Sequence, residues 1–427
     1  MGDVPHRPRT VLAVLGATGL SAAIAACGSS AQTPPATTTR QAVTVADAGT
    51  TPPILASPAA SGTARCRATT VATLAGVAKR IYFQGAHGRN GANAMRRLGR
   101  SSALADAVAS GNHAATITAL QPLLKHQILH ITIRHRSKVV ADVGHVPVMS
   151  PVHGRLYTSG GALAGTYVLS VMNPASFAGI TSGLTGSTVI VRSGSRHVAG
   201  GAAAPGVHYR TVTFRGTAFP SGPLRISVMV PPSALRSCAA GGRVSATDVL
   251  GKVAMRLFDA ETRGSRVQQA LNYVAHDKAY RTALAARDRA GITAAVRDGF
   301  FHVRRYHMVR VRGSRGRNFV VDVGGPFVLA PASMTLRGPG GRNEGKITLA
   351  IQDDTGYIKL LTRFTGGAVI LRERGVLVPG STFDPAPAHI PKRGVVTWHG
   401  RRYDAISFTG RAFPSGPLRI SLLVPLR

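Results

Sequence analysis

Two adjacent carboxylates near the C-terminus are the side chains in this sequence best suited to hold a small molecule. Asp353 and Asp354 stand where a predicted strand passes into a predicted helix. Together they could bind the ammonium group of a ligand or a cation. A carboxylate in that position also caps a helix by accepting a hydrogen bond from a backbone N–H group. The sequence leaves both interpretations open.

Three further polar side chains, Tyr357, Lys359 and Arg363, follow on the same predicted helix. The guanidinium group of arginine can bind a ligand carboxylate through two parallel hydrogen bonds. The two basic residues could equally be solvated charges on the outer face of the helix. We predict a ligand-binding group that consists of Asp353, Asp354, Tyr357, Lys359 and Arg363.

The patterns that mark common catalytic and metal sites are missing. The chain has no G-x-S-x-G turn between a predicted strand and helix, no phosphate-binding loop with its Lys and Ser, and no H-E-x-x-H or C-x-x-C arrangement. Only 17 residues are acidic, which leaves few general acids. We predict no catalytic residue, no metal and no cofactor, and therefore a protein that is not an enzyme.

The first residues resemble a bacterial lipoprotein signal peptide. The apolar run VLAVLGATGLSAAIAA follows a basic start and ends in IAAC, at Ile24 to Cys27. The resemblance implies cleavage after residues 1–26 and a diacylated, palmitate-bearing Cys27 that anchors the chain to the cell membrane. An ordinary secretory peptide is the alternative, and both place the protein outside the cytoplasm. The Ser-, Thr-, Pro- and Ala-rich stretch 27–64 is expected to be a disordered stalk.

The charge of the chain has two explanations. The formal net charge is +35, and only eight of the 52 basic residues are lysine. Such an arginine bias arises from a GC-rich coding sequence or from selection for a polyanionic partner. An exported protein does not meet nucleic acid, so the available polyanions are those of the cell envelope. No apolar stretch of 18 residues follows the signal peptide, so signalling would need a separate membrane receptor.

One stretch of eighteen residues occurs twice. FRGTAFPSGPLRISVMVP occupies 214–231, and FTGRAFPSGPLRISLLVP occupies 408–425. Three other pairs of similar blocks line up in the same order, with small insertions between them. These pairs are 77–90 with 253–266, 139–151 with 319–331, and 165–192 with 345–372. The chain therefore contains two copies of one fold.

Within each copy, helical periodicity comes first and strand alternation follows. In the first copy, a helix is predicted over 68–84, two short helices over 103–126 with a break at 110–112, and strands over 128–135, 138–144 and 166–172. The repeated block supplies the last strand of each copy. Near the end of the second strand, Asp142 and Asp322 occupy equivalent places in ADVG and VDVG, a pattern that predicts turn formation. The order indicates N-terminal helices packed on one antiparallel sheet that carries an inserted helix.

The phrases VVDVGGPFVLAP, LAIQDDTGYIKLLTRFTGGAVILR and AFPSGPLRISLLVP, which follow a helix carrying RLFDAETRG, resemble the extracytoplasmic Cache family of PAS-like sensory domains. The resemblance covers both copies and is stronger in the second. It implies an α+β fold with two tandem Cache-like domains, 65–236 and 237–427, and a small-molecule pocket on one face of a sheet. The Tyr, Arg, Trp and Asp pattern of the amino-acid-sensing members is missing, so the ligand class does not carry over.

Two cysteines remain besides Cys27. Cys66 precedes the first helix of copy one, and Cys238 follows its last strand. In an oxidising compartment such a pair predicts a disulfide, with two free buried thiols as the alternative.

Three hypotheses about function follow from the sequence. The first is a lipid-anchored extracytoplasmic sensor that binds a small molecule in its second domain. The second is a structural protein that binds envelope polyanions, and the third is an envelope hydrolase.

Overall fold

The structure is a computed structural model of the 427-residue chain. It describes residues 62–124, 128–220, 222–241, 244–303, 306–325, 328–413 and 416–426. The predicted signal peptide and Cys27 lie outside the described residues. The protein is a mixed α+β structure with antiparallel sheets, as the sequence predicts. Its first helix begins at Thr63, inside the segment assigned to the stalk.

The first repeat opens with four helices. These are α1 (Thr63–His87), α2 (Arg89–Gly99), α3 (Ser102–Ala109) and α4 (His113–Leu124). A four-stranded sheet in the order β2-β1-β5-β4 follows, made of β1 (His130–His135), β2 (Lys138–Gly144), β4 (Val152–Tyr157) and β5 (Leu163–Ser170). After α5 (Pro174–Thr185) comes a sheet in the order β3-β8-β9-β6-β7, made of β3 (Val148–Met149), β6 (Thr188–Ser193), β7 (Arg196–Gly200), β8 (Arg210–Phe219) and β9 (Gly222–Val230).

The second repeat starts after the 3-10 helix η1 (Pro232–Gly241). Its helices are α6 (Ala246–Arg263), α7 (Ser265–His276), α8 (Lys278–Ala286) and α9 (Arg289–Ala294), followed by the short turns η2 (Ala295–Gly299) and η3 (Phe300–His302). The four-stranded sheet β11-β10-β14-β13 contains β10 (Arg310–Arg315), β11 (Phe319–Gly324), β13 (Ala332–Arg337) and β14 (Asn343–Ala350), with η4 (Pro339–Gly341) before β14.

The last helix and the larger sheet complete the second repeat. The helix is α10 (Asp354–Thr365). The sheet has the order β12-β18-β19-β15-β16, and β17 pairs with β18. Its strands are β12 (Val328–Leu329), β15 (Ala368–Glu373), β16 (Val376–Leu377), β17 (Arg393–Trp398), β18 (Arg401–Phe413) and β19 (Gly416–Pro425).

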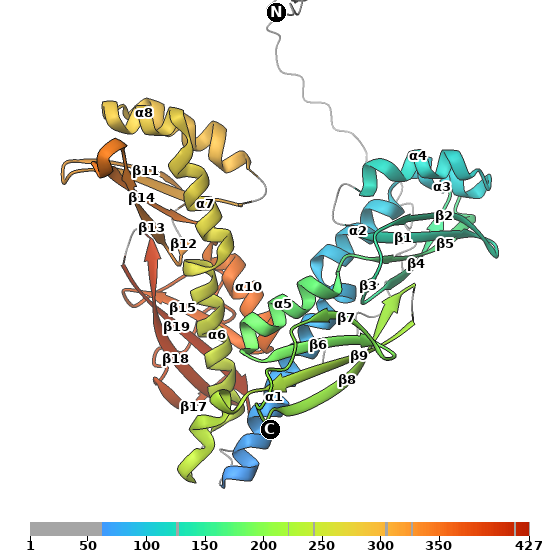
Figure 1. Cartoon of the computed structure of the whole chain (residues 1–427), viewed down its shortest axis with the longest axis horizontal. Helices are drawn as coiled ribbons and strands as arrows, with labels where there is room; N and C mark the ends of the chain where they lie inside the picture. Colours follow the sequence, from blue (N-terminus) through green and yellow to red (C-terminus); the bar gives the residue numbers. More distant parts are fainter. Residues whose placement is uncertain are drawn as a thin grey trace, which may run out of the picture. The chain divides into compact units, whose positions relative to one another are not determined.

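Apart from the additional strand β17 and short helical turns in the second repeat, the two repeats have the same order of elements, which supports the duplication. Each repeat holds two antiparallel sheets where the sequence predicts one. Figure 1 shows the four-stranded sheet with its helices at one end of each repeat and the larger sheet at the other. The division occurs at β3 and β12, because these two-residue strands pair with β8 and β18 and not with their sequence neighbours. The repeated eighteen-residue block forms β9 and β19, which lie in the middle of the larger sheets.

The main hydrophobic core is drawn from both repeats. Val77 and Ile81 of α1 belong to the same buried cluster as Val253 of α6 and Leu361 of α10. Each repeat also has a smaller cluster of its own between its four-stranded sheet and the neighbouring helices. The described residues fall in one compact unit. The segments 65–236 and 237–427 are therefore two halves of one packed structure and not two separately packed bodies.

Each repeat supplies an arginine to the last turn of a helix in the other. Arg256 of α6 donates from Nη1 to the carbonyl oxygen of Thr185, at 2.6 Å, where α5 ends. A Cβ atom on the following Gly186, whose φ is +64°, would lie 2.5 Å from Arg256 Nη2. Arg80 of α1 approaches Gly366, after α10, in the same way. The glycines thus end the helices in the left-handed region and also leave room for the guanidinium groups.

We expect Arg256→Ala to lower the free energy of unfolding by about 2 kcal/mol, because it removes charged hydrogen bonds to a helix C-terminus. Urea unfolding of a chain that begins after Cys27 measures this. Arg263→Ala on the same helix is the matched control. Its exposed pair with Asp259 should be worth less than about 0.5 kcal/mol. Equal losses in the two variants would contradict a special role for the contact between repeats.

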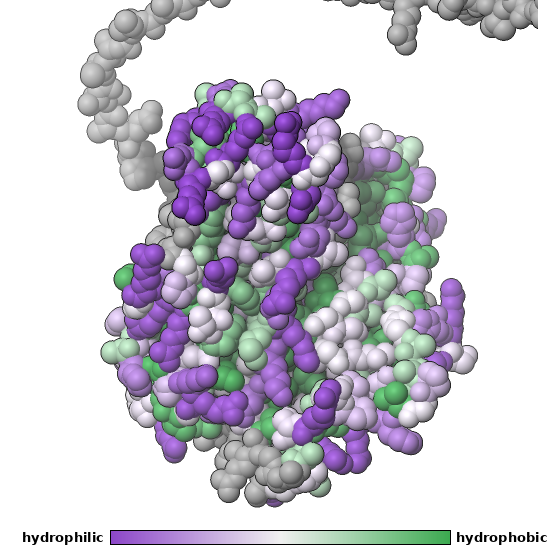
Figure 2. All heavy atoms as spheres, turned by 60° about the vertical axis from the view of Figure 1, so that its left-hand side comes forward, coloured by the Kyte–Doolittle hydropathy of each residue, from purple (hydrophilic) through white to green (hydrophobic). Residues whose placement is uncertain are grey.

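A disulfide joins the two ends of the first repeat. Cys66, in the first turn of α1, and Cys238, in η1, form the disulfide that the sequence predicts. Among the described residues, no helix is long and apolar enough to cross a membrane. Figure 2 shows hydrophilic side chains over most of the face it presents, with hydrophobic ones interspersed.

Candidate functional site

The first predicted site residue, Asp353, caps a helix. Its side chain accepts a hydrogen bond from the backbone N–H of Gly356 at the start of α10. Asn173 does the same for α5 in the first repeat, where its Oδ1 accepts from Ser176 N at 2.6 Å. The capping interpretation is therefore confirmed for Asp353.

The neighbouring Asp354 is buried, with 2% of its surface exposed, and neither carboxylate oxygen has a hydrogen-bond partner among the described residues. Burial, together with the negative charges of Glu373 and Asp353, raises the pKa of Asp354 to about 7. The carboxyl group is therefore held in an environment that favours its neutral form.

The remaining three residues of the predicted ligand group do not meet Asp354 around a cavity. Tyr357 lies in the main core, its ring edge-on to Phe258, and its hydroxyl donates to the carbonyl oxygen of Ala254 at 3.0 Å. Lys359 is exposed and Arg363 is half-buried. At 3.6 residues per turn, Lys359 and Arg363 lie about 140° and 180° around the helix from Asp354. The helix thus separates its acidic and basic side chains.

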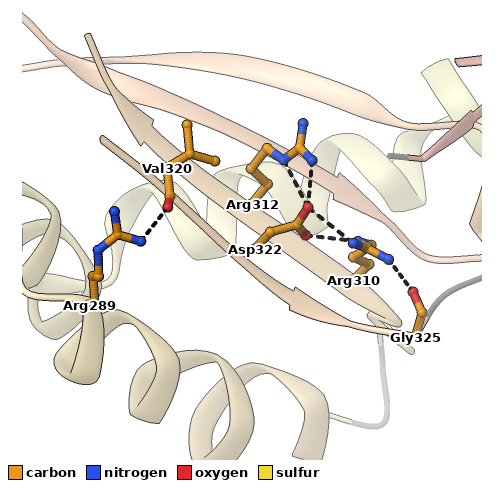
Figure 3. Close-up of polar contacts among 6 residues, drawn as sticks. All are labelled: Arg289, Arg310, Arg312, Val320, Asp322 and Gly325. Atoms are coloured by element: carbon orange, nitrogen blue, oxygen red, sulfur yellow. Dashed lines mark hydrogen bonds and ion pairs between the residues drawn. The ribbon is translucent and has the colours of Figure 1, made fainter. Parts of the chain in front are cut away.

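A different group of side chains forms on the second repeat's four-stranded sheet. Asp322 of β11 accepts from two arginines of β10, which reach its carboxylate as Figure 3 shows. Arg310 Nε lies 2.8 Å from Asp322 Oδ1, and Arg312 Nε lies 3.0 Å from Oδ2. The strand register sets Arg312 opposite Asp322, and Arg310 is two residues away on the same face. The prediction that Asp322 serves a turn is therefore wrong: it holds two cations in place.

The guanidinium groups of these two arginines have further contacts that fix them. Both lie over the ring of Phe413 at the end of β18, at 5.2 Å for Arg310 and 4.9 Å for Arg312. Arg310 also donates to the carbonyl oxygen of Gly325. Burial alone would raise the pKa of Asp322, but the hydrogen bonds and charges of Arg310 and Arg312 outweigh it and hold the pKa below its ordinary value.

The first repeat has an equivalent group with different chemistry. Asp142 accepts from Thr132 Oγ1 at 2.5 Å and lies 2.9 Å from His130 Nε2. The ring of Phe219 lies against His130, with centroids 4.9 Å apart. The hydrogen bond from Thr132 lowers the pKa of Asp142 against the effect of burial, and His130 adds to the lowering. The turn prediction is wrong for Asp142 as well.

A cavity of about 420 Å³ opens beside Asp322 in the second repeat. Its lining consists of Thr293, Arg297, Phe301, Asp322, Val323 and Gly324, none of which belongs to the predicted ligand group. Arg297 is exposed, and the negative charge of Asp322 is compensated by Arg310 and Arg312, which lie outside the lining. Such a cavity suits an anionic group that can accept from guanidinium donors.

The sequence contains a local signal for the group formed by Arg310, Arg312 and Asp322. Arg310 and Arg312 are separated by one residue in a strand, and a short turn connects that strand to the strand carrying Asp322. Pairing the two strands as a hairpin would have placed all three side chains on one face. The contribution of Phe413, about 100 residues later, has no such local signal.

No protein-family model matches the chain, and no curated protein matches it at a significant level. Its function must therefore be argued from the geometry of its side chains.

Proposed function

We propose that the chain is an extracytoplasmic, lipid-anchored protein that binds a small anionic molecule in the cavity beside Asp322. The observation that carries the proposal is the exposed Arg297 in the wall of that cavity, beside an Asp322 whose charge is already compensated by Arg310 and Arg312. The sensory role expected from the sequence then requires a separate membrane receptor to receive the signal.

The charges at the cavity wall favour anion binding. The carboxylate of Asp322 is paired with Arg310 and Arg312, so its negative charge is compensated from outside the lining. Arg297 lines the cavity and offers a guanidinium group that is not bonded to Asp322. A carboxylate or phosphate group can accept hydrogen bonds from Arg297.

Location outside the cytoplasm is supported by the lipoprotein-like start of the sequence and by the Cys66–Cys238 disulfide, because disulfides persist in oxidising compartments. We also propose that each repeat is a Cache-like unit. The order of helices before antiparallel strands, with one helix inserted, supports this assignment. In this view the two units are fused through a common core.

Ligand-dependent thermal stabilisation tests the anion site. Succinate, citrate and phosphate would be compared with glycerol at constant ionic strength, and we expect at least one anion to raise the melting temperature. Ligand at 100 times its dissociation constant adds about 2.7 kcal/mol to stability. Arg297→Ala should weaken binding at least tenfold.

Arg196→Ala, an exposed arginine on β7 of the first repeat, is the control that loses the same charge elsewhere. If no anion stabilises the protein, the proposal is wrong. If both variants lose affinity equally, and the protein binds teichoic acid in a salt-sensitive manner, the envelope-polyanion hypothesis is supported instead.

A further inference from the structure

We propose a second binding site, for a neutral carbohydrate, in an open recess where α7 meets α8. The recess has a volume of about 530 Å³, within the range of small-molecule sites. One wall is the exposed stripe of α7 that carries Gln269, Asn272, Tyr273 and His276, and Tyr306 before β10 contributes another. The recess shares no lining residue with the cavity beside Asp322.

Tyr273 provides a fixed aromatic surface. The residue is 39% exposed, although its ring packs edge-on against the buried Phe300, at 5.8 Å between centroids, and at a tilt against Tyr306, at 5.3 Å. The ring is therefore held by the core while part of it faces solvent. A rigid tyrosine of this kind offers apolar contact at low entropic cost, which suits the C–H face of a sugar ring.

The amide and imidazole groups beside Tyr273 suit hydroxyl groups. The side-chain amide of Asn272, which lines the recess, offers two donors and an acceptor. His276 Nδ1 lies 2.7 Å from the backbone oxygen of Asn272. A carbonyl oxygen can only accept, so Nδ1 carries the proton and Nε2 of the neutral ring remains an acceptor. Hydroxyl groups, which both donate and accept, match this mixture.

The charges in the recess point to a neutral ligand. Lys278 carries a positive charge and Asp277 a negative one, so the lining has no net charge apart from His276. The carboxylate of Asp277 is already engaged as the cap of α8, where it accepts from Tyr280 N at 2.8 Å. The recess therefore lacks an arginine like Arg297, which favours anions beside Asp322. A polyhydroxylated neutral ligand satisfies the amide and the aromatic surface together.

Saturation-transfer NMR on the intact mature chain, with maltotriose, cellotriose and chitotriose as probes, tests the site. We expect at least one trisaccharide to bind, and Tyr273→Ala to weaken that binding at least tenfold. Asn272→Ala provides a second variant without a core contact, so a folding defect in the first would not decide the outcome. Tyr157→Ala removes a similarly exposed tyrosine of the first repeat and should leave binding unchanged.

Absence of binding by all three sugars would overturn the proposal, as would equal losses in Tyr157→Ala and Asn272→Ala. Arg297→Ala should bind the sugar normally. The same panel therefore separates failure of this site from failure of the anion site.

Discussion

At pH 8, the Asp354→Asn variant will have a higher free energy of unfolding than the unchanged protein, whereas at pH 4 the two will be nearly alike. In the folded state the pKa of Asp354 is about 7, against an ordinary value of 3.8. As the pH rises between these values, the unfolded chain loses its proton first, so the folded state loses stability. The difference of about three pKa units corresponds to about 4 kcal/mol at most.

Urea unfolding at both pH values measures this effect. Asp259→Asn is the control, because this carboxylate is exposed and paired with Arg263. It should shift stability by less than about 1 kcal/mol at either pH. A gain in Asp354→Asn that is the same at pH 4 and pH 8 would mean that ionisation of Asp354 is not the cause.

Removal of the disulfide is expected to have an effect of similar size. The Cys66–Cys238 bond joins residues 172 positions apart and thus closes a loop that includes almost all of the first repeat. Native disulfides contribute about 2–5 kcal/mol, and the chain-entropy model predicts about 5 kcal/mol for a loop of this length. We expect the Cys66→Ala/Cys238→Ala double variant to unfold at a correspondingly lower urea concentration.

Reduction of the disulfide with dithiothreitol is the matched comparison, measured on a chain that begins after Cys27. It should lower the stability of the unchanged protein to that of the double variant and leave the stability of the variant unaffected. Two free thiols in the mass spectrum of the non-reduced protein, or equal stability of the two proteins, would refute the prediction.

Features that depend on neighbours in the sequence could be predicted. The duplication is evident from the repeated blocks of similar sequence. The cap at Asp353 follows from a short polar side chain at the start of a predicted helix. The disulfide followed from the positions of Cys66 and Cys238 at the two ends of one repeat.

Features that depend on contacts between residues far apart in the sequence could not be predicted. The residue types of Val148 and Met149 give no signal that β3 pairs with β8 in the larger sheet. An aromatic ring such as that of Tyr357 can line a pocket or lie in a core. Its contacts with α6, which the sequence does not reveal, place it in the core. The pairing of Asp322 with arginines of β10 has a local signal in the hairpin, but the contact of those arginines with Phe413 of the larger sheet has none.

The exchange of arginines between the repeats has an evolutionary consequence. Reciprocal contacts of this kind are those of a symmetric homodimer, in which any substitution is made in both subunits at once. Once the two subunits are joined in a single gene, each half can change while the other preserves the assembly. The equivalent aspartates illustrate this independence, because Asp142 is paired with a histidine in one half and Asp322 with arginines in the other.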